Sequence, residues 1–191
     1  MEILILGPQG SGKGTQANRI ASEYGFPHIA TGEILRGAVA AETELGRRVK
    51  PILEAGALVD DGLMIELIRD RLDEPDAAEG FVLDGFPRTL VQSEALDAML
   101  GEIGRPLVVV FEFIVSDDVC IQRLLARAEL EGRTDDTPDA IAQRLALYHE
   151  LTEPVVEHYR VTGRLVGIHA DRSVDTVFLE VQAALERAGV A

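Results

Sequence analysis

A glycine-rich loop near the start of the chain limits the choice of fold most strongly. Residues 7–15, GPQGSGKGT, contain four glycines and directly follow the apolar run EILIL. Glycine in a folded segment costs backbone entropy, so this density needs a reason. The spacing G-x-x-x-x-G-K is typical of a loop between a buried strand and a helix, whose backbone N–H groups bind phosphate oxygens. The loop therefore predicts an α/β fold with a nucleotide phosphate site.

The lysine of this loop, Lys13, is one of only two lysines in the chain. We expect it to bind the β- and γ-phosphates as a mobile positive charge, while the N-terminus of the following helix adds its dipole. The usual motif has serine or threonine directly after the lysine, whereas here Gly14 follows it and Thr15 comes one residue later. An ordinary glycine-rich turn is the alternative, but the strand before the loop and the helix after it both favour phosphate binding.

Apolar runs and helical segments alternate along the whole chain. This pattern predicts a three-layer α/β fold with a parallel five-stranded sheet and helices on both faces. Strands are expected within residues 2–6, 28–31, 80–87, 106–115 and 164–169. Ligands of such folds bind beyond the carboxyl ends of the strands, where Gly7, Thr31, Asp84 and the segment after Val115 would lie.

Four local features carry more specific expectations. Thr31 is predicted to cap a helix. Pro51 is expected to break or kink a helix, and Pro154 to bend a later one. The polar segment around Gly132, residues 128–136, is interpreted as a loop.

Composition excludes several classes of function. The 191 residues fit one domain, and a net charge of −15 argues against nucleic acid or an anionic membrane as a partner. The single cysteine, Cys120, allows neither an intrachain disulfide nor a cysteine-based zinc site. Because no apolar run approaches the roughly 20 residues of a membrane span and the N-terminus is unlike a signal peptide, we expect a cytoplasmic protein.

Further motifs follow the glycine-rich loop in a fixed order. They are TGEILR at 31–36, GALV at 56–59, DGFPRT at 84–89 and GRTDDT at 132–137. Together with the G-K-G-T form of the loop, they make the chain resemble the adenylate kinase family of nucleoside monophosphate kinases over essentially its whole length. The resemblance implies reversible phosphoryl transfer between ATP and AMP to give two ADP, contributing to adenine nucleotide homeostasis.

The same resemblance implies the division of the chain into parts. The P-loop core would comprise residues 1–29, 60–125 and 139–191, with an AMP-binding insertion at 30–59 and a short lid at 126–138. We expect both insertions to move, since closing a lid excludes water from the transferring phosphate. The partners implied are ATP, AMP and ADP, acting on a monomer.

Site residues carried over from the family fall into three sets. The catalytic set would be Lys13, Arg88, Arg123, Arg133 and Arg144. The ATP-binding set would be Gly10, Ser11, Gly12, Lys13, Gly14, Thr15, Arg123, Arg127 and Arg172. The AMP-binding set would be Thr31, Arg36, Ala57, Leu58, Val59, Gly85, Phe86, Pro87, Arg88, Gln92, Arg133 and Arg144. These residue types suit the reaction, because phosphoryl transfer needs positioning and charge neutralisation, and the planar fork of arginine grips two phosphate oxygens.

The implied cofactor is Mg²⁺, bound with ATP. Asp84 ends the apolar strand FVLD, where a carboxylate lies near the nucleotide's Mg²⁺, in this family mainly through water. A turn or capping aspartate is the alternative. Family members with long lids sometimes bind zinc through cysteines, whereas the short lid here implies no zinc. Asp135 and Asp136 would either orient Arg133 or act as charges in the first turn of a helix.

Thr31 and Gln92 favour AMP as the acceptor. Related UMP/CMP kinases tend to carry alanine and asparagine at these positions, and a glutamine amide can both donate and accept along the Watson–Crick edge of adenine. Three alternatives are a pyrimidine monophosphate kinase, a P-loop switch that regulates a partner, and an inactive relative. The dense acceptor-site motifs argue against a switch, and the intact Lys13 and Arg88 argue against inactivity.

Overall fold

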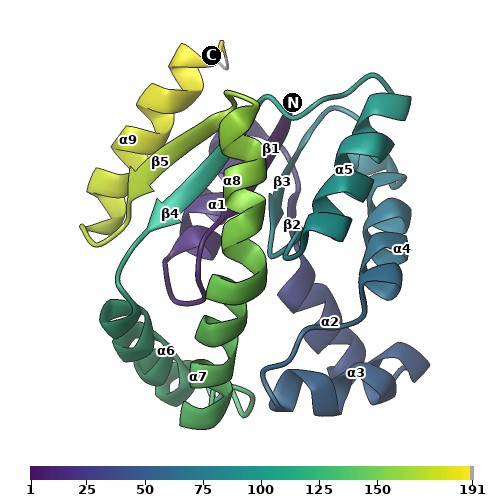
Figure 1. Ribbon diagram of the computed structural model, residues 1–191, viewed down its shortest axis with the longest axis vertical. Helices are drawn as coiled ribbons and strands as arrows, with labels where there is room; N and C mark the ends of the chain where they lie inside the picture. Colours follow the sequence, from purple (N-terminus) through teal and green to yellow (C-terminus); the bar gives the residue numbers. More distant parts are fainter. Residues whose placement is uncertain (190–191) are drawn as a thin grey trace.

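The computed structural model describes residues 1–189 and contains the expected five-stranded parallel sheet between layers of helices (Figure 1). The strand order is β2-β3-β1-β4-β5, which confirms the predicted fold class. The strands are β1 (Glu2–Leu6), β2 (His28–Ala30), β3 (Phe81–Asp84), β4 (Val109–Ile114) and β5 (Leu165–His169). The α-helices are α1 (Lys13–Tyr24), α2 (Thr31–Ala40), α3 (Glu44–Glu54), α4 (Asp61–Leu72), α5 (Leu90–Glu102), α6 (Asp117–Glu131), α7 (Pro138–Leu147), α8 (Glu153–Val161) and α9 (Val174–Arg187).

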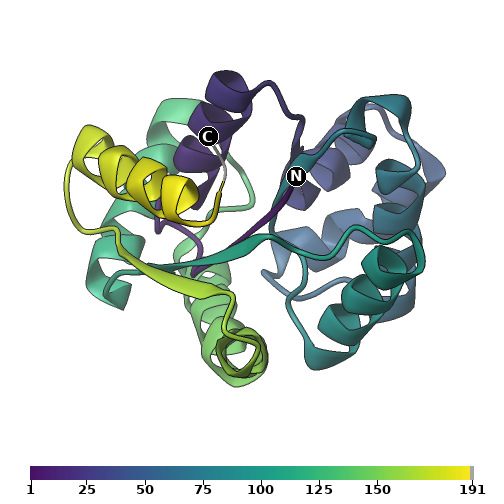
Figure 2. The same cartoon turned by 90° about the horizontal axis from the view of Figure 1, so that it is seen from above.

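Alternate residues of each strand enter two separate apolar clusters. From β1, Leu4 and Leu6 pack into the cluster that includes α4, α5 and α8, whereas Ile3 and Ile5 pack into the cluster that includes α1 and α9. Figure 2 shows α1 and α9 on one side of the sheet and α8 on the other. Because both faces are covered, the strands are almost continuously apolar, as parallel strands usually are.

The register brings the carboxyl ends of the central strands together. Ile5 lies opposite Asp84 of β3, and Leu6 lies opposite Glu112 of β4. The glycine-rich loop that comes after β1 therefore emerges in the middle of the sheet, beside the last residue of β3. Helices α2 and α3 project beyond this edge on the β2 side, and α6 and α7 project beyond it on the β4 side (Figure 1).

Two expectations about helix boundaries are wrong. Thr31 is the first residue of α2 rather than its cap, and its hydroxyl donates to the carbonyl of Asp84 at 3.3 Å. Pro51 lies inside α3 without ending it. The helix continues to Glu54, so the break expected at Pro51 is absent.

The expected loop at residues 128–131 is also wrong, because α6 continues through Glu131. Gly132 then ends the helix in the left-handed conformation at φ 63°, as glycine commonly does. The irregularity expected near Pro154 is a π-helical turn, Tyr148–Thr152, between α7 and α8. Only the second part of the expected loop, from Gly132 on, lies outside α6.

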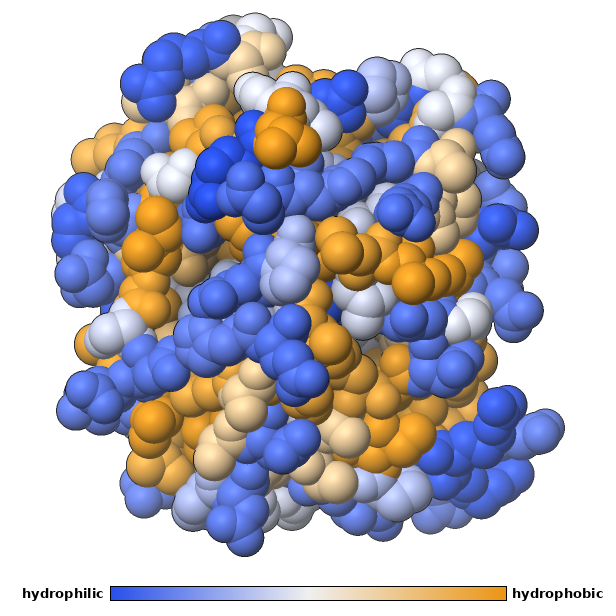
Figure 3. Space-filling view, in the orientation of Figure 1, coloured by the Kyte–Doolittle hydropathy of each residue, from blue (hydrophilic) through white to orange (hydrophobic). Residues whose placement is uncertain are grey.

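The face of the molecule shown in Figure 3 is largely hydrophilic, with apolar side chains between the charged ones. Within residues 1–189, none of the helices combines the length and the apolar character needed to cross a bilayer.

Candidate functional site

A cavity of about 420 Å³ opens at the carboxyl edge of the sheet. The glycine-rich loop, helix α2 and the segment 57–59 contribute to its wall, together with helices α6 and α7. The residues expected at the site that line it are Gly10, Gly12, Lys13, Gly14, Thr15, Thr31, Arg36, Ala57, Leu58, Val59, Asp84, Gly85, Arg88, Gln92, Arg123, Arg127, Arg133 and Arg144. The cavity thus gathers six arginines and a lysine inside a protein of net charge −15.

The glycine-rich loop packs tightly against α6. Gly10 has φ +84°, and a Cβ added there would lie 2.6 Å from the carbonyl oxygen of Cys120. No side chain caps the N-terminus of α1, so its first backbone N–H groups point toward the cavity without a side-chain partner. Such a terminus attracts anions.

Lys13 and Asp84 form a buried pair at the base of the cavity. The Lys13 Nζ donates to the Pro8 carbonyl at 3.3 Å and lies 4.0 Å from Asp84 Oδ1. Burial lowers the pKa of Lys13, against the opposing effect of the Asp84 charge. Burial alone would raise the pKa of Asp84, but Lys13 and the nearby His28 hold it below its usual value. Asp84 is therefore a carboxylate at neutral pH.

One oxygen of this carboxylate accepts no hydrogen bond. Asp84 Oδ1 is buried, with only the Lys13 ammonium at 4.0 Å, and His28 Nε2 lies 3.6 Å from Oδ2. A buried carboxylate oxygen without a hydrogen bond fits a hard cation or the water that such a cation carries. In the part of the chain that the structure describes, no group of three or more His, Cys, Asp or Glu side chains is placed to hold a metal ion.

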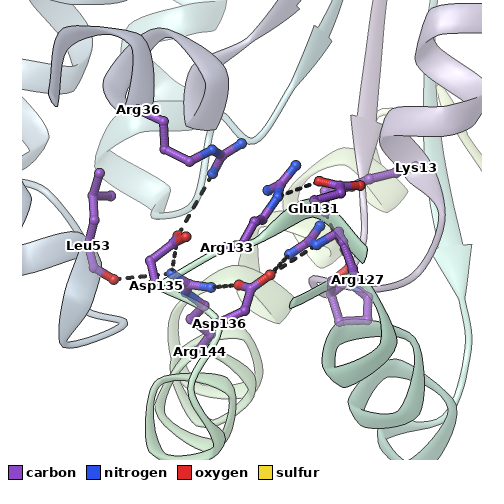
Figure 4. Close-up of polar contacts among 10 residues, drawn as sticks. Lys13, Arg36, Leu53, Arg127, Glu131, Arg133, Asp135, Asp136 and Arg144 are labelled. Atoms are coloured by element: carbon purple, nitrogen blue, oxygen red, sulfur yellow. Dashed lines mark hydrogen bonds and ion pairs between the residues drawn. The ribbon is translucent and has the colours of Figure 1, made fainter. Parts of the chain in front are cut away.

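Two aspartates of the lid hold two arginines in place (Figure 4). Asp136 is fully buried and accepts from Arg127 Nε at 3.0 Å, from Arg127 Nη2 at 2.6 Å, and from Arg144 Nη1. Asp135 accepts from Arg144 Nη2 at 2.8 Å and lies 4.0 Å from Arg36 Nη1. The carboxylates fix the guanidinium groups while leaving them at the cavity wall.

Two further arginines of the cavity donate to backbone carbonyls. Arg88 Nε donates to Gly85 O at 2.8 Å, and Arg123 Nη2 donates to Ala170 O at 3.0 Å. Burial lowers the pKa of Arg88, and Asp84 opposes this, but a guanidinium stays protonated in proteins. The cavity thus combines fixed guanidinium groups from several elements with the Lys13 ammonium.

Comparison with known proteins identifies the family of the chain. A model of the adenylate kinase family matches residues 5–164. The chain belongs to the adenylate kinase family. It is 48% identical over 183 residues to the adenylate kinase of Thermus thermophilus, covering 96% of each chain. Against the adenylate kinase of Stenotrophomonas maltophilia it is 41% identical over 186 residues, covering 97% of this chain and all of the relative. Its enzyme class is thus ATP:AMP phosphotransferase.

Four residues expected at the site of an adenylate kinase do not line the cavity. Phe86 is fully buried in the core, and the hydroxyl of Ser11 is buried. Pro87 lines a separate space of about 20 Å³. Arg172 is exposed, and its guanidinium binds His169 O and Glu180. Side chains at these positions support the loops rather than face the cavity.

The expectation that Asp135 and Asp136 orient Arg133 is wrong. Asp135 and Asp136 bind Arg127 and Arg144 rather than Arg133. Arg133 Nε instead donates to Glu131 Oε2 at 2.6 Å (Figure 4). Asp136 thus joins Arg127 of α6 to Arg144 of α7, whereas Arg133 pairs with the last residue of α6.

Sequence reasoning also missed Asp61 in this adenylate kinase. Its Oδ1 accepts from Gln92 Nε2 at 2.8 Å, although 31 residues separate the two. No motif in the sequence links these positions. Only the packing of α4 beside α5 brings them together.

Proposed function

We propose that this adenylate kinase binds ATP and AMP at opposite ends of the cavity and transfers the γ-phosphoryl group between them. The observation that carries the proposal is the convergence of Lys13, at the start of α1, with six arginines from α2, α6, α7 and the loops after β3 and α6. Two nucleotides bring several negative charges into one space. A cavity lined by these cations suits such ligands by charge.

The glycine-rich loop and α6 would bind ATP. The backbone of residues 10–15 supplies N–H groups, and Lys13 reaches the phosphates that are transferred. Arg123 joins the loop to the segment after β5, since it contacts Ser11 O at 3.3 Å and Ala170 O at 3.0 Å. Arg127 lies further along α6, at the edge of the lid.

AMP would bind between α2, residues 57–59 and α5. Leu35, Val59 and Met64 give this part of the cavity apolar walls suited to a base. Gln92 supplies an amide beside those walls. Arg36 and Arg88 lie on the side of the cavity nearer the phosphate loop and would bind the acceptor phosphate.

Transfer itself would depend on charge and alignment. Lys13 and the arginines neutralise the charge on the transferring group, without any protein nucleophile. Mg²⁺, held by ATP oxygens and water near Asp84, would add charge neutralisation when bound. The pairs made by Asp135 and Asp136 hold Arg144 and Arg127 ready before the nucleotides arrive.

Residues 30–59 and 126–138 would close over the nucleotides. Arg36 Nη1 lies 4.0 Å from Asp135 Oδ2, so the two segments already approach each other across the cavity, and Leu53 O accepts from Arg144 Nη2 of the core at 3.1 Å. Closure would exclude water, the competing acceptor. Comparing the free enzyme with a complex of two adenosines bridged by five phosphates tests this movement, and identical positions of both segments would refute it. The monomeric state stays a prediction from the family. The cytoplasmic location stays a prediction from the sequence.

Removing Arg88 tests the assignment of the site. We expect Arg88→Ala to lower kcat by about 100-fold or more, as for loss of a charge that stabilises a transition state, with unfolding unchanged in cooperativity. Arg69→Ala is the matched control, because Arg69 is an exposed arginine outside the cavity. Rates with AMP, CMP and UMP under ATP then test the acceptor. A preference for UMP would refute the choice of AMP.

A further inference from the structure

The side-chain amide of Gln92 is held at both ends by the protein. Its Oε1 accepts from the backbone N–H of Arg88 at 2.7 Å, and its Nε2 donates to Asp61 Oδ1 at 2.8 Å. The residue is only 2% exposed, yet it lines the cavity. Its orientation is therefore decided by two partners of opposite polarity.

Turning this amide by 180° would break both bonds. The Nε2 group would then face the N–H of Arg88, donor against donor, and Oε1 would face the Asp61 carboxylate, acceptor against acceptor. An amide offers two N–H donors and two acceptor lone pairs. In the orientation seen, one N–H and one lone pair remain for a ligand, in a fixed order.

Asp61 is itself firmly placed. It lies in the first turn of α4, after the cap Asp60, and its Oδ1 also accepts from Thr89 Oγ1 at 3.1 Å. Thr89 caps α5 by accepting from the backbone N–H of Gln92 at 3.2 Å. Asp61 does not line the cavity, so it acts on a ligand only through Gln92.

We infer that Asp61 is a positioning residue for base selection, locking the Gln92 amide so that it accepts from an exocyclic amino group and donates to a ring nitrogen. This inference rests on the proposed function, in which Gln92 faces the acceptor base. Adenine presents that pattern at N6 and N1. Hypoxanthine has the same two rings but presents an oxo group at C6 and an N–H at N1, so the locked amide opposes it at both positions.

The comparison of AMP with IMP isolates this effect, because the two nucleotides differ in the polarity of one edge and hardly in size. With Asp61 present, IMP is a poor acceptor. Without Asp61, rotation of the Gln92 amide by 180° breaks one hydrogen bond instead of two. The kcat/KM for IMP should therefore rise relative to that for AMP. Because a hydrogen bond to a charged group is lost, the ratio of kcat/KM for AMP to that for IMP should fall by about tenfold or more.

The experiment measures this ratio for the wild type, Asp61→Ala, Gln92→Ala and the double variant. Asp61→Asn is added because an asparagine amide preserves the packing and can face either orientation of Gln92, so it should shift the ratio in the same direction. Asp70→Ala is the matched control: it removes an exposed carboxylate from the same helix, α4, far along the helix from Asp61. Its ratio should equal that of the wild type.

The double variant separates positioning from a structural role. If Asp61 acts through Gln92, then Asp61→Ala should change the ratio in the wild type but not in the Gln92→Ala background. An unchanged ratio in both Asp61 variants, or an equal further shift in the Gln92→Ala background, would overturn the inference. A wild type that does not phosphorylate AMP would instead refute the proposed function, which is a separate outcome.

Discussion

Replacing Asp136 with asparagine would test whether this one carboxylate organises the arginines of the lid. Its side chain is fully buried and accepts three hydrogen bonds, two from Arg127 and one from Arg144. Asparagine keeps the shape and one oxygen but loses the charge, and its NH₂ group would face a guanidinium. Arg127 would then lose the countercharge that holds it, and Arg144 would keep only Asp135 as a carboxylate partner.

The expected loss of stability depends on the exposure of the partners. Removing one member of a fully buried ion pair costs about 3–5 kcal/mol. Arg127 is 30% exposed and Arg144 is 11% exposed, so both can recover some hydration. We therefore expect the free energy of unfolding to fall by about 2–3 kcal/mol. With a urea dependence of about 2–3 kcal/mol per molar for a chain of this size, the midpoint should fall by ~1 M.

Urea unfolding and steady-state turnover, measured on the same samples, provide the assay. The turnover number should fall by about tenfold or more, because small displacements of positioned groups are costly to catalysis. Asp139→Asn is the control, as Asp139 is an exposed carboxylate in the first turn of α7, and it should change stability by no more than ~0.5 kcal/mol. Wild-type stability and turnover in Asp136→Asn would show that the arginines do not depend on this carboxylate.

Three further predictions concern the base of the cavity. Lys13→Met should lower kcat by about 100-fold or more, because the charge that stabilises the transition state is removed. The rate of ADP formation measures this, and a near-normal rate would contradict the catalytic role of Lys13. Gly10→Ala should lower the melting temperature, because the new Cβ would lie 2.6 Å from Cys120 O at φ +84°; a melting curve like that of the wild type would count against the tight packing of the loop. Because the pKa of Asp84 is lower in the folded state, its contribution to stability is complete above about pH 4 and is lost as the pH falls through the folded-state pKa. Urea midpoints of the wild type and Asp84→Asn should therefore converge in acid, and a difference that grows on acidification would refute this assignment.

The fold was predictable because its strands are buried on both sides. Runs such as EILIL and VVVFEF, inside residues 106–115, have few alternatives to a buried parallel strand, and the glycine-rich loop requires a helix after the first of them. The end of α6 was harder. Ala128, Glu129, Leu130 and Glu131 look polar as a group, but each favours a helix, and Gly132 is the actual stop.

Most residues expected at the site line the cavity, but their hydrogen-bond partners were not predictable. Motif spacing places Arg133 and Arg144 near one cavity, because each lies close to the end of an element that borders it. Which carboxylate binds which guanidinium depends on the angle between α6 and α7, and the sequence carries no direct signal of that angle. The contact of Asp61 with Gln92 was hidden for the same reason, since it depends on how α4 lies beside α5.

The hydrogen bond from Arg144 to Leu53 O gives one guanidinium two roles. It stands where a phosphate would be held, and it also fastens helix α3 to α7 over the entrance. Any outward swing of α3 must undo that bond, but Asp135 and Asp136 would still hold the Arg144 guanidinium where it is. Opening on this side would thus cost one hydrogen bond and leave the positive charge of the cavity intact.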